Sequence, residues 1–202
     1  MKIKVCGMKS PENIQALSEL PIDMIGLIFY EKSPRCVEIR DADKINALSI
    51  KIPKVGVFVN ATKGAILEKV ERFGLQYVQL HGGESPEFCG EIKKEGISVI
   101  KSFQLEEVKD FEICYKYENK CDYFLFDSAT PQYGGSGKKF NWDILNEYSG
   151  QTPFILSGGI GPEDSIPALH NLFAIDLNSK FETSPGIKDI ESLRRFIFSL
   201  RA

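Results

Sequence analysis

The chain has little of what a metal centre or a disulfide framework needs. It contains only two histidines and five widely scattered cysteines, none of which forms a CxxC pair. Such a set cannot complete an ordinary zinc site, and an odd number of dispersed cysteines is typical of a reduced, cytoplasmic protein. Cys89, Cys114 and Cys121 are interpreted as small buried apolar residues. We therefore expect free thiols and no structural metal.

Long apolar runs and an excess of one charge are also lacking. No run of about 18 apolar residues is present, so no membrane-spanning helix is expected. The first residues, Met1 to Cys6, carry positive charge without an apolar stretch, which argues against a secretory signal. Lys and Arg total 25 against 28 Asp and Glu, giving a net charge of −3. This balance argues against a broad surface for nucleic acid or anionic membrane, and leaves a local basic pocket open.

What is present is an ordinary globular composition with a regular alternation of apolar and amphipathic stretches. Apolar residues make up 43% of 202 residues and no linker divides them, so residues 1–202 are expected to form one domain. Expected strands cover residues 3–6, 24–29, 55–59, 76–80, 98–103, 123–126, 154–156 and 173–177. Expected helices cover 11–20, 41–49, 62–73, 86–94, 106–117, 141–148, a short stretch after Pro162, and 189–200. Repeated β-α units predict parallel pairing and favour a closed (β/α)8 TIM barrel over an open doubly wound sheet.

In such a barrel the active site lies where the strands end at their carboxyl sides. Cys6, His81 and Asp127 each stand at such an end. From the residues alone, Asp127 is either a cap for the following turn or a functional acid, and His81 is either a ligand contact or a structural histidine. Because side chains alternate along a strand, Lys4 shares the face of Cys6 and needs a buried partner, for which Asp176 is the nearest candidate.

A glycine turn follows the seventh strand. Ser157-Gly-Gly-Ile-Gly161 precedes the helix expected at Pro162, and Asn178-Ser179 follows the eighth strand. Glycines allow close backbone approach and a helix N-terminus attracts anions, so the pair of turns favours a phosphate site over a plain turn. The stretch 128–140 is long for a connection in a compact domain, and is either a lid or a surface loop.

The strand ends and their loops form an ordered set of motifs. They are Lys4-Val-Cys-Gly-Met8, Gly26-Leu-Ile-Phe-Tyr30 with Ser33-Pro-Arg35, Val55-Gly-Val-Phe-Val-Asn60, Val78-Gln-Leu-His-Gly82, Asp127 with Tyr133-Gly-Gly-Ser-Gly-Lys138, Ser157-Gly-Gly159 and Asp176-Leu-Asn-Ser179. Collinear from residue 3 to about 186, this set resembles the phosphoribosylanthranilate isomerase family. The resemblance implies a (β/α)8 barrel of tryptophan biosynthesis. The reaction would be an Amadori rearrangement of N-(5-phosphoribosyl)anthranilate, carried out without a metal or organic cofactor.

The resemblance also implies roles for individual residues. Cys6 is similar to the general base of the family and Asp127 to its general acid. Arg35 resembles the residue that meets the anthranilate carboxylate. Gly158, Gly159, Asn178 and Ser179 resemble the phosphate cradle, and His81 and Asp176 are further candidates for substrate binding. Here Lys180 stands where many members have glycine, which leaves the geometry of that loop and a contact with the phosphate open.

Both catalytic candidates have ordinary pKa values that suit their roles poorly at pH 7. We expect the apolar strand around Asp127 to raise its pKa, and nearby positive groups to lower that of Cys6. Because Arg35 follows the second strand in a loop, it is expected to contribute to substrate binding much more than to stability.

Two other functions stay open. One is the sister isomerase of histidine biosynthesis, which resembles this chain less, has Asp where Cys6 stands, and acts on a two-phosphate substrate; only one SGG-type turn is visible here. The other is a metabolite-binding barrel without activity. The sequence leaves the oligomeric state open between monomer and homodimer.

Overall fold

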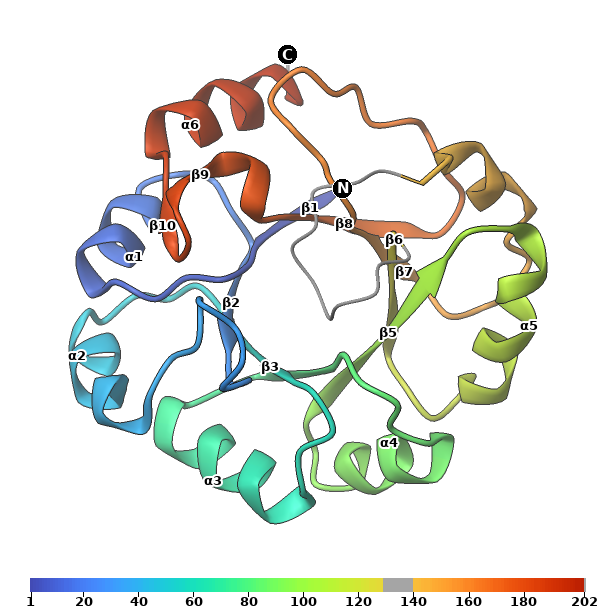
Figure 1. Cartoon of the computed structure of the whole chain (residues 1–202), viewed down its shortest axis with the longest axis horizontal. Coiled ribbons are helices and arrows are strands. Elements are labelled where there is room, and N and C mark those ends of the chain that lie inside the picture. Colours follow the sequence, from blue (N-terminus) through green and yellow to red (C-terminus); the bar gives the residue numbers. More distant parts are fainter. Residues whose placement is uncertain (129–139, 202) are drawn as a thin grey trace.

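Eight parallel strands pair in sequence order and close on themselves in the computed structural model, which describes residues 1–128 and 140–201 (Figure 1). The barrel closes where β1 pairs with β8 in a register that puts Lys4 opposite Asp176. The TIM barrel and its eight expected strands are thereby confirmed. The strands are β1 (Lys2–Val5), β2 (Met24–Ile28), β3 (Lys54–Phe58), β4 (Tyr77–Leu80), β5 (Ser98–Leu105), β6 (Tyr123–Ser128), β7 (Phe154–Leu156) and β8 (Leu172–Leu177).

Helices surround the barrel as an outer ring (Figure 1). Four of the α-helices begin at a capping side chain: Ser10, Thr62, Ser85 and Asp189 each accept a hydrogen bond from a backbone N–H of the first turn. The α-helices are α1 (Pro11–Leu17), α2 (Ala42–Ala47), α3 (Lys63–Phe73), α4 (Pro86–Lys93), α5 (Phe111–Cys114) and α6 (Ile190–Ser199). The 3-10 helices are η1 (Ile39–Asp41), η2 (Val108–Asp110), η3 (Tyr115–Tyr117), η4 (Trp142–Glu147) and η5 (Ser179–Phe181).

The barrel interior has an apolar layer beneath a polar one. The apolar layer packs one residue from each of several strands: Met24, Val55, Ile100, Leu125, Ile155 and Ala174. Because side chains alternate along a strand, the residue two positions further on faces the same interior. Asp127 follows Leu125 in this way, and Asp176 follows Ala174. The apolar layer thus closes the barrel below, and the candidate site residues stand above it.

The prediction of a helix after Pro162 is wrong. Residues 157–171, all of them described, form no helix between β7 and β8. Pro167 lies only five residues beyond Pro162, and a proline removes a helix hydrogen bond and disfavours the helical conformation of the residue before it. Instead the chain makes a turn, in which Gly161 N–H donates to Asp164 Oδ2 at 2.7 Å. The glycine turn after β7 therefore has no helix N-terminus behind it.

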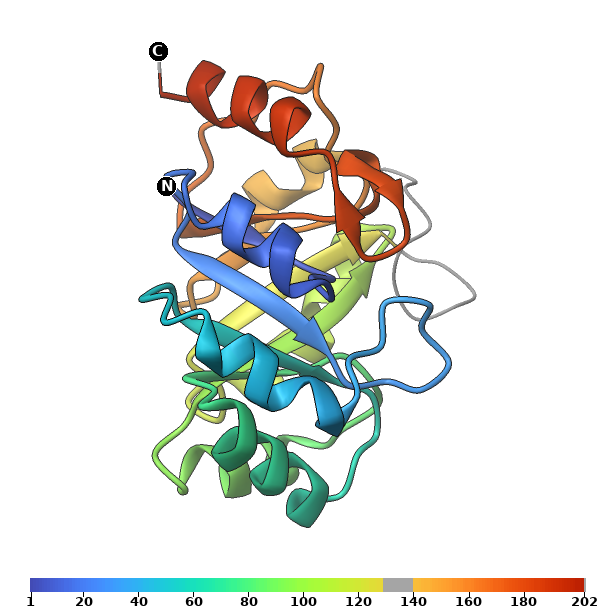
Figure 2. The same cartoon turned by 90° about the vertical axis from the view of Figure 1, so that its left-hand side faces the viewer.

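Two other local features differ from expectation. The stretch 106–117 divides into η2, α5 and η3 instead of one helix, and 141–148 is the 3-10 helix η4. An antiparallel hairpin, β9 (Glu182–Ser184) with β10 (Ile187–Lys188), is inserted between β8 and α6. Figure 2 shows it at the end of the barrel toward which the parallel strands run. The Gly134–Lys138 motif and most of the stretch considered as a lid lie outside the described residues. Among the described residues, no helix is long and apolar enough to cross a membrane.

Candidate active site

A buried ion pair crosses the barrel seam beneath the site. Lys4 Nζ lies 2.8 Å from Asp176 Oδ2, and the two side chains are 0% and 5% exposed. Burial disfavours the ammonium, but Asp176 and Cys6 outweigh it and raise the pKa of Lys4. The predicted Lys4–Asp176 pair is confirmed. Asp176 contacts Lys4 through Oδ2, whereas its Oδ1 is buried without a hydrogen-bond partner among the described residues.

Cys6 stands directly after β1, buried beside that ion pair. Its Sγ fits against Gly26 of β2, where an added Cβ would approach the sulfur to 2.7 Å. Burial raises the pKa of the Cys6 thiol, and Lys4 opposes this only in part. The expectation of a lowered pKa is therefore wrong, because burial removes more solvation from the thiolate than one already paired ammonium returns. All five cysteines are free thiols, and Cys89, Cys114 and Cys121 are buried as expected.

Asp127 lies near the end of β6 with its side chain 15% exposed. Burial is the largest influence on it and raises the pKa of Asp127 to about 6, with a further contribution from Asp176. The backbone N–H of Ser128 donates to Asp127 Oδ1 at 2.8 Å and opposes the shift. The predicted direction is confirmed. The same Lys4–Asp176 pair influences both Cys6 and Asp127, so the structure gathers these four side chains at one place.

His81 follows β4 and turns toward Asp127. Its Nδ1 lies 2.8 Å from Ser102 Oγ and 3.0 Å from Gln79 Nε2, and its Nε2 lies 3.8 Å from Asp127 Oδ2. Burial, aided by the charges of Lys101 and Lys4, lowers the pKa of His81 to about 4. At neutral pH the ring is therefore uncharged. It has structural partners and yet borders the candidate acid, so a substrate contact stays a prediction.

The glycine turn after β7 brings backbone N–H groups next to Asp127. Gly158 and Gly159 have φ angles of +93° and +70°, which L side chains rarely adopt. A Cβ on Gly158 would come within 2.8 Å of Ser128 N and 3.0 Å of Asp127 Oδ1. Among the described residues, no acceptor is found for the N–H groups of Gly158 and Gly159. These N–H donors are suited to bind an anion, but no helix dipole adds to the attraction because no helix follows the turn.

Asn178 and Ser179 follow β8 on the neighbouring strand, as expected. Asn178 Oδ1 accepts from the buried Lys188 Nζ at 2.8 Å, so this side chain is already engaged. Lys180 is exposed. It lies next to the glycine turn, because a Cβ on Gly161 would be 3.7 Å from Lys180 Cβ. The placement of these residues fits a phosphate cradle, whose use stays a prediction.

Arg35 reaches the site from the loop after β2, over Gly7. An added Cβ on Gly7 would lie 2.7 Å from both Arg35 Cδ and Asn178 Oδ1. The guanidinium binds the carboxylate of Glu182 through Nε at 2.9 Å and Nη2 at 2.6 Å, and the Glu182 side chain is 4% exposed. Lys188 Nζ lies 2.6 Å from the same carboxylate. The loop position of Arg35 predicts a role in substrate binding much more than in stability. Because its guanidinium also neutralises a buried charge on the hairpin, we expect it to contribute to stability as well.

Arg35→Met is expected to raise KM and also to lower the free energy of unfolding by about 1.5–3 kcal/mol, the scale of hydrogen bonds to a charged group. Urea unfolding and steady-state kinetics measure the two effects. Glu182→Gln is the matched control, because it weakens the support of the guanidinium without removing it. Unchanged stability of Arg35→Met would contradict the structural role, and unchanged KM would remove Arg35 from the site.

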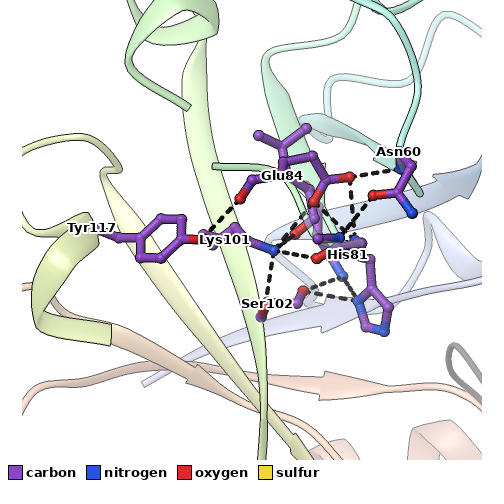
Figure 3. A network of polar contacts seen from close by, with 10 residues as sticks. Asn60, His81, Glu84, Lys101, Ser102 and Tyr117 are labelled. Atoms are coloured by element: carbon purple, nitrogen blue, oxygen red, sulfur yellow. Dashed lines mark hydrogen bonds and ion pairs between the residues drawn. The ribbon is translucent and has the colours of Figure 1, made fainter. Parts of the chain in front are cut away.

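Several polar residues near the site were missed by the sequence analysis. Glu84, in the loop after β4, and Lys101, in the middle of β5, form a buried ion pair at 3.2 Å (Figure 3). Lys188, on β10, is 2% exposed and joins Glu182 to Asn178. A lysine within the apolar stretch Val-Ile-Lys101-Ser-Phe is the signal that could have found the first pair. The described residues contain no cluster of three or more potential metal ligands.

The closed barrel, with an acid and a thiol at its strand ends beside an open glycine turn, marks the chain as a (β/α)8-barrel enzyme. A family model described as N-(5'phosphoribosyl)anthranilate (PRA) isomerase matches residues 3–198. The chain belongs to this family.

Individual relatives agree along the whole chain. An N-(5'-phosphoribosyl)anthranilate isomerase of Parabacteroides distasonis is 52% identical over 206 residues, covering 98% of this chain and 92% of the relative. The solved phosphoribosyl anthranilate isomerase of Thermotoga maritima is 34% identical with a TM-score of 0.87, covering 100% of this chain and 98% of that one. A third, solved in complex with reduced 1-(o-carboxyphenylamino)-1-deoxyribulose 5-phosphate, is 31% identical with a TM-score of 0.83 and the same coverage.

Proposed function

We propose that this chain converts N-(5-phosphoribosyl)anthranilate to 1-(2-carboxyphenylamino)-1-deoxyribulose 5-phosphate in cytoplasmic tryptophan biosynthesis, with Asp127 as general acid and Cys6 as general base. One observation carries the assignment of roles. A carboxyl whose pKa burial raises to about 6 and a buried thiol stand at the strand ends beside one shared Lys4–Asp176 pair. Family membership supplies the reaction, and the two titratable groups supply its proton transfers.

The reaction needs one acid and one base in turn. Asp127 gives its proton to the furanose ring oxygen while the C1–O bond breaks, and the nitrogen lone pair forms the C1=N bond of a Schiff base. The Cys6 thiolate then removes the C2 proton, and the electrons of that C–H bond form the enolamine. The enolamine tautomerises to the ketone product. Positioned acid–base groups contribute about 10² to 10⁴ in rate for such steps.

The strand order is compatible with Asp127 as acid and Cys6 as base. β7 and β8 lie between β6, which carries Asp127, and β1, which leads to Cys6. The two groups therefore approach a bound sugar from different walls of the barrel. The intervening strands end in the glycine turn and in Asn178-Ser179, where the substrate phosphate would receive the N–H groups of Gly158 and Gly159. Arg35, held by Glu182 above Gly7, is the proposed partner of the anthranilate carboxylate.

The direct test follows the loss of anthranilate-substrate fluorescence with the purified chain. We expect turnover of N-(5-phosphoribosyl)anthranilate and none of the two-phosphate substrate of the histidine-pathway isomerase. Binding without turnover would support the inactive metabolite-binding barrel instead. Turnover of the two-phosphate substrate at a comparable rate would contradict the single-substrate assignment.

A further inference from the structure

The backbone of His81 is held on several sides where β4 ends (Figure 3). Its N–H donates to the carbonyl oxygen of Phe58, on the neighbouring strand β3, at 2.8 Å. Lys101 Nζ donates to the carbonyl oxygens on either side of this histidine, those of Leu80 at 3.1 Å and Gly82 at 2.7 Å. The position of His81 is therefore fixed independently of what its ring contacts.

Two buried side chains hold the ring at Nδ1. Ser102 Oγ lies 2.8 Å from Nδ1 and Gln79 Nε2 lies 3.0 Å from it, while Gln79 Nε2 also donates to Ser102 Oγ at 3.3 Å. An amide nitrogen only donates, so Ser102 Oγ accepts from Gln79, and its own hydroxyl proton is available to Nδ1. Nδ1 is thus the acceptor in this group. In a neutral imidazole the proton then lies on Nε2.

The charge on the other side of the ring favours the same tautomer. His81 Nε2 lies 3.8 Å from Asp127 Oδ2, and the other oxygen of that carboxylate accepts from Ser128 N–H at 2.8 Å. An unprotonated Nε2 would point a lone pair at a carboxylate oxygen, whereas Nε2–H presents a donor to it. The separation is longer than a hydrogen bond, and catalytic contacts of this kind commonly shorten when the reaction complex forms.

Gln79 makes these contacts at a cost to the fold. Its side chain is buried, and its Oε1 has no hydrogen-bond partner among the described residues. A buried acceptor without a donor lowers the free energy of unfolding, so stability alone does not account for an amide at this place in the barrel. The donor that the same amide offers to the His81 ring gives the position a role.

We propose that Gln79 and Ser102 are positioning residues, which fix His81 in its Nε2–H tautomer. In this tautomer the neutral ring donates toward Asp127 Oδ2 and gives up no proton itself. When Asp127 passes its proton to the ring oxygen of the substrate, negative charge develops on its carboxylate, and Nε2–H is already aimed at that charge. Fixed donors aimed at developing charge are a major source of rate enhancement. This inference rests on the proposed function and deepens it by naming the groups that assist the acid.

Nitrogen NMR measures the tautomer directly, because the chain has only two histidines. In protein labelled with nitrogen-15 histidine, protonated and unprotonated ring nitrogens have well-separated shifts, and couplings to the carbon-bound ring protons identify Nε2. His170 is exposed, and its signals are assigned with His170→Gln. His81 is expected to show a protonated Nε2 and an unprotonated Nδ1 at the pH of the activity assay. A proton on Nδ1 in the wild type would overturn the proposal.

Gln79→Glu tests whether the tautomer matters for the reaction. Its carboxylate accepts where the amide nitrogen donated, and so draws the proton to Nδ1. We expect at least about tenfold lower kcat, the effect of one hydrogen bond to a charged group, with unchanged affinity for the reduced product analogue. Gln79→Met is the matched variant, because it keeps the bulk and adds no acceptor while Ser102 still donates. It should keep the Nε2–H signal and a higher kcat than Gln79→Glu. Equal kcat in the two variants despite different tautomers would overturn the proposal.

A second pair of variants gives the decision if Gln79→Glu does not fold or keeps its proton on Nε2. His81→Gln places an amide N–H near the position of Nε2, where it can donate to Asp127, whereas His81→Leu fills similar space without a donor. His81→Gln is expected to retain at least about tenfold more kcat than His81→Leu. Equal kcat in these two would overturn the proposal. The NMR measurement needs no turnover, so failure of the proposed isomerisation would be seen separately in the wild-type assay.

Discussion

Asp127→Asn is expected to lose roughly a thousandfold or more in kcat, the upper part of the range for general acid–base catalysis. An amide has no acidic proton, so it cannot protonate the ring oxygen as the furanose opens. With a pKa of about 6, Asp127 is protonated in about a tenth of the molecules at pH 7, whereas an ordinary Asp would be protonated in about one in a thousand. Burial therefore raises the population of the working acid about a hundredfold.

The control for this variant is to show that the protein stays folded and still binds ligand. Asp127 accepts from the N–H of Ser128, and an amide oxygen at the same place accepts the same bond, so Asp127→Asn is expected to stay folded and to bind the reduced product analogue. Ser128→Ala is the matched variant, because it keeps that backbone N–H and the carboxyl. A fluorescence assay and analogue titration decide between the outcomes. Turnover of Asp127→Asn within tenfold of the wild type would remove Asp127 as the acid.

The barrel and the position of Asp127 at its rim could be predicted because they depend on local alternation. The periods of strands and helices are visible in the sequence. Because side chains alternate along a strand, residues two positions apart, such as Leu125 and Asp127 or Lys4 and Cys6, are expected on the same face. The same count, together with closure between β1 and β8, is enough to pair Lys4 with Asp176. These inferences need no knowledge of which loops meet.

What could not be predicted depends on contacts between distant loops. Glu182 lies on a hairpin whose turn the Pro185-Gly186 pair indicates, but only the folded chain brings this carboxylate to Arg35, 147 positions away. The enclosure of the Glu84 carboxylate likewise requires the loops after β3 and β4 to meet at Gly82. The sequence predicts the wrong direction for the pKa of Cys6 because it does not show how completely the thiol is buried, and burial outweighs the charge of Lys4.

The raised pKa of Cys6 has a consequence for how the rate depends on pH. The reacting form requires protonated Asp127 and deprotonated Cys6. Below about pH 6 Asp127 stays protonated, so kcat/KM rises with pH as thiolate forms. Between the two pKa values the gain of thiolate offsets the loss of the Asp127 proton, and the profile is flat. Above the raised pKa of Cys6, thiolate formation is complete, and kcat/KM falls as Asp127 continues to lose its proton.

Cys6→Ser is expected to lose at least about a hundredfold in kcat, the low end of general-base catalysis, because a hydroxyl is a far poorer base at any pH of the assay. It should also lose the alkaline decline, since the serine hydroxyl does not finish ionising within the measured range. Cys114→Ser, on the outer helix α5, is the matched control and should keep both rate and profile. A merely structural thiol would give Cys6→Ser lower stability with an unchanged pH profile. Near wild-type turnover in Cys6→Ser would instead assign the removal of the C2 proton to another group. His81, which lies beside Asp127, is the first candidate, although its pKa of about 4 makes the neutral ring a weak base.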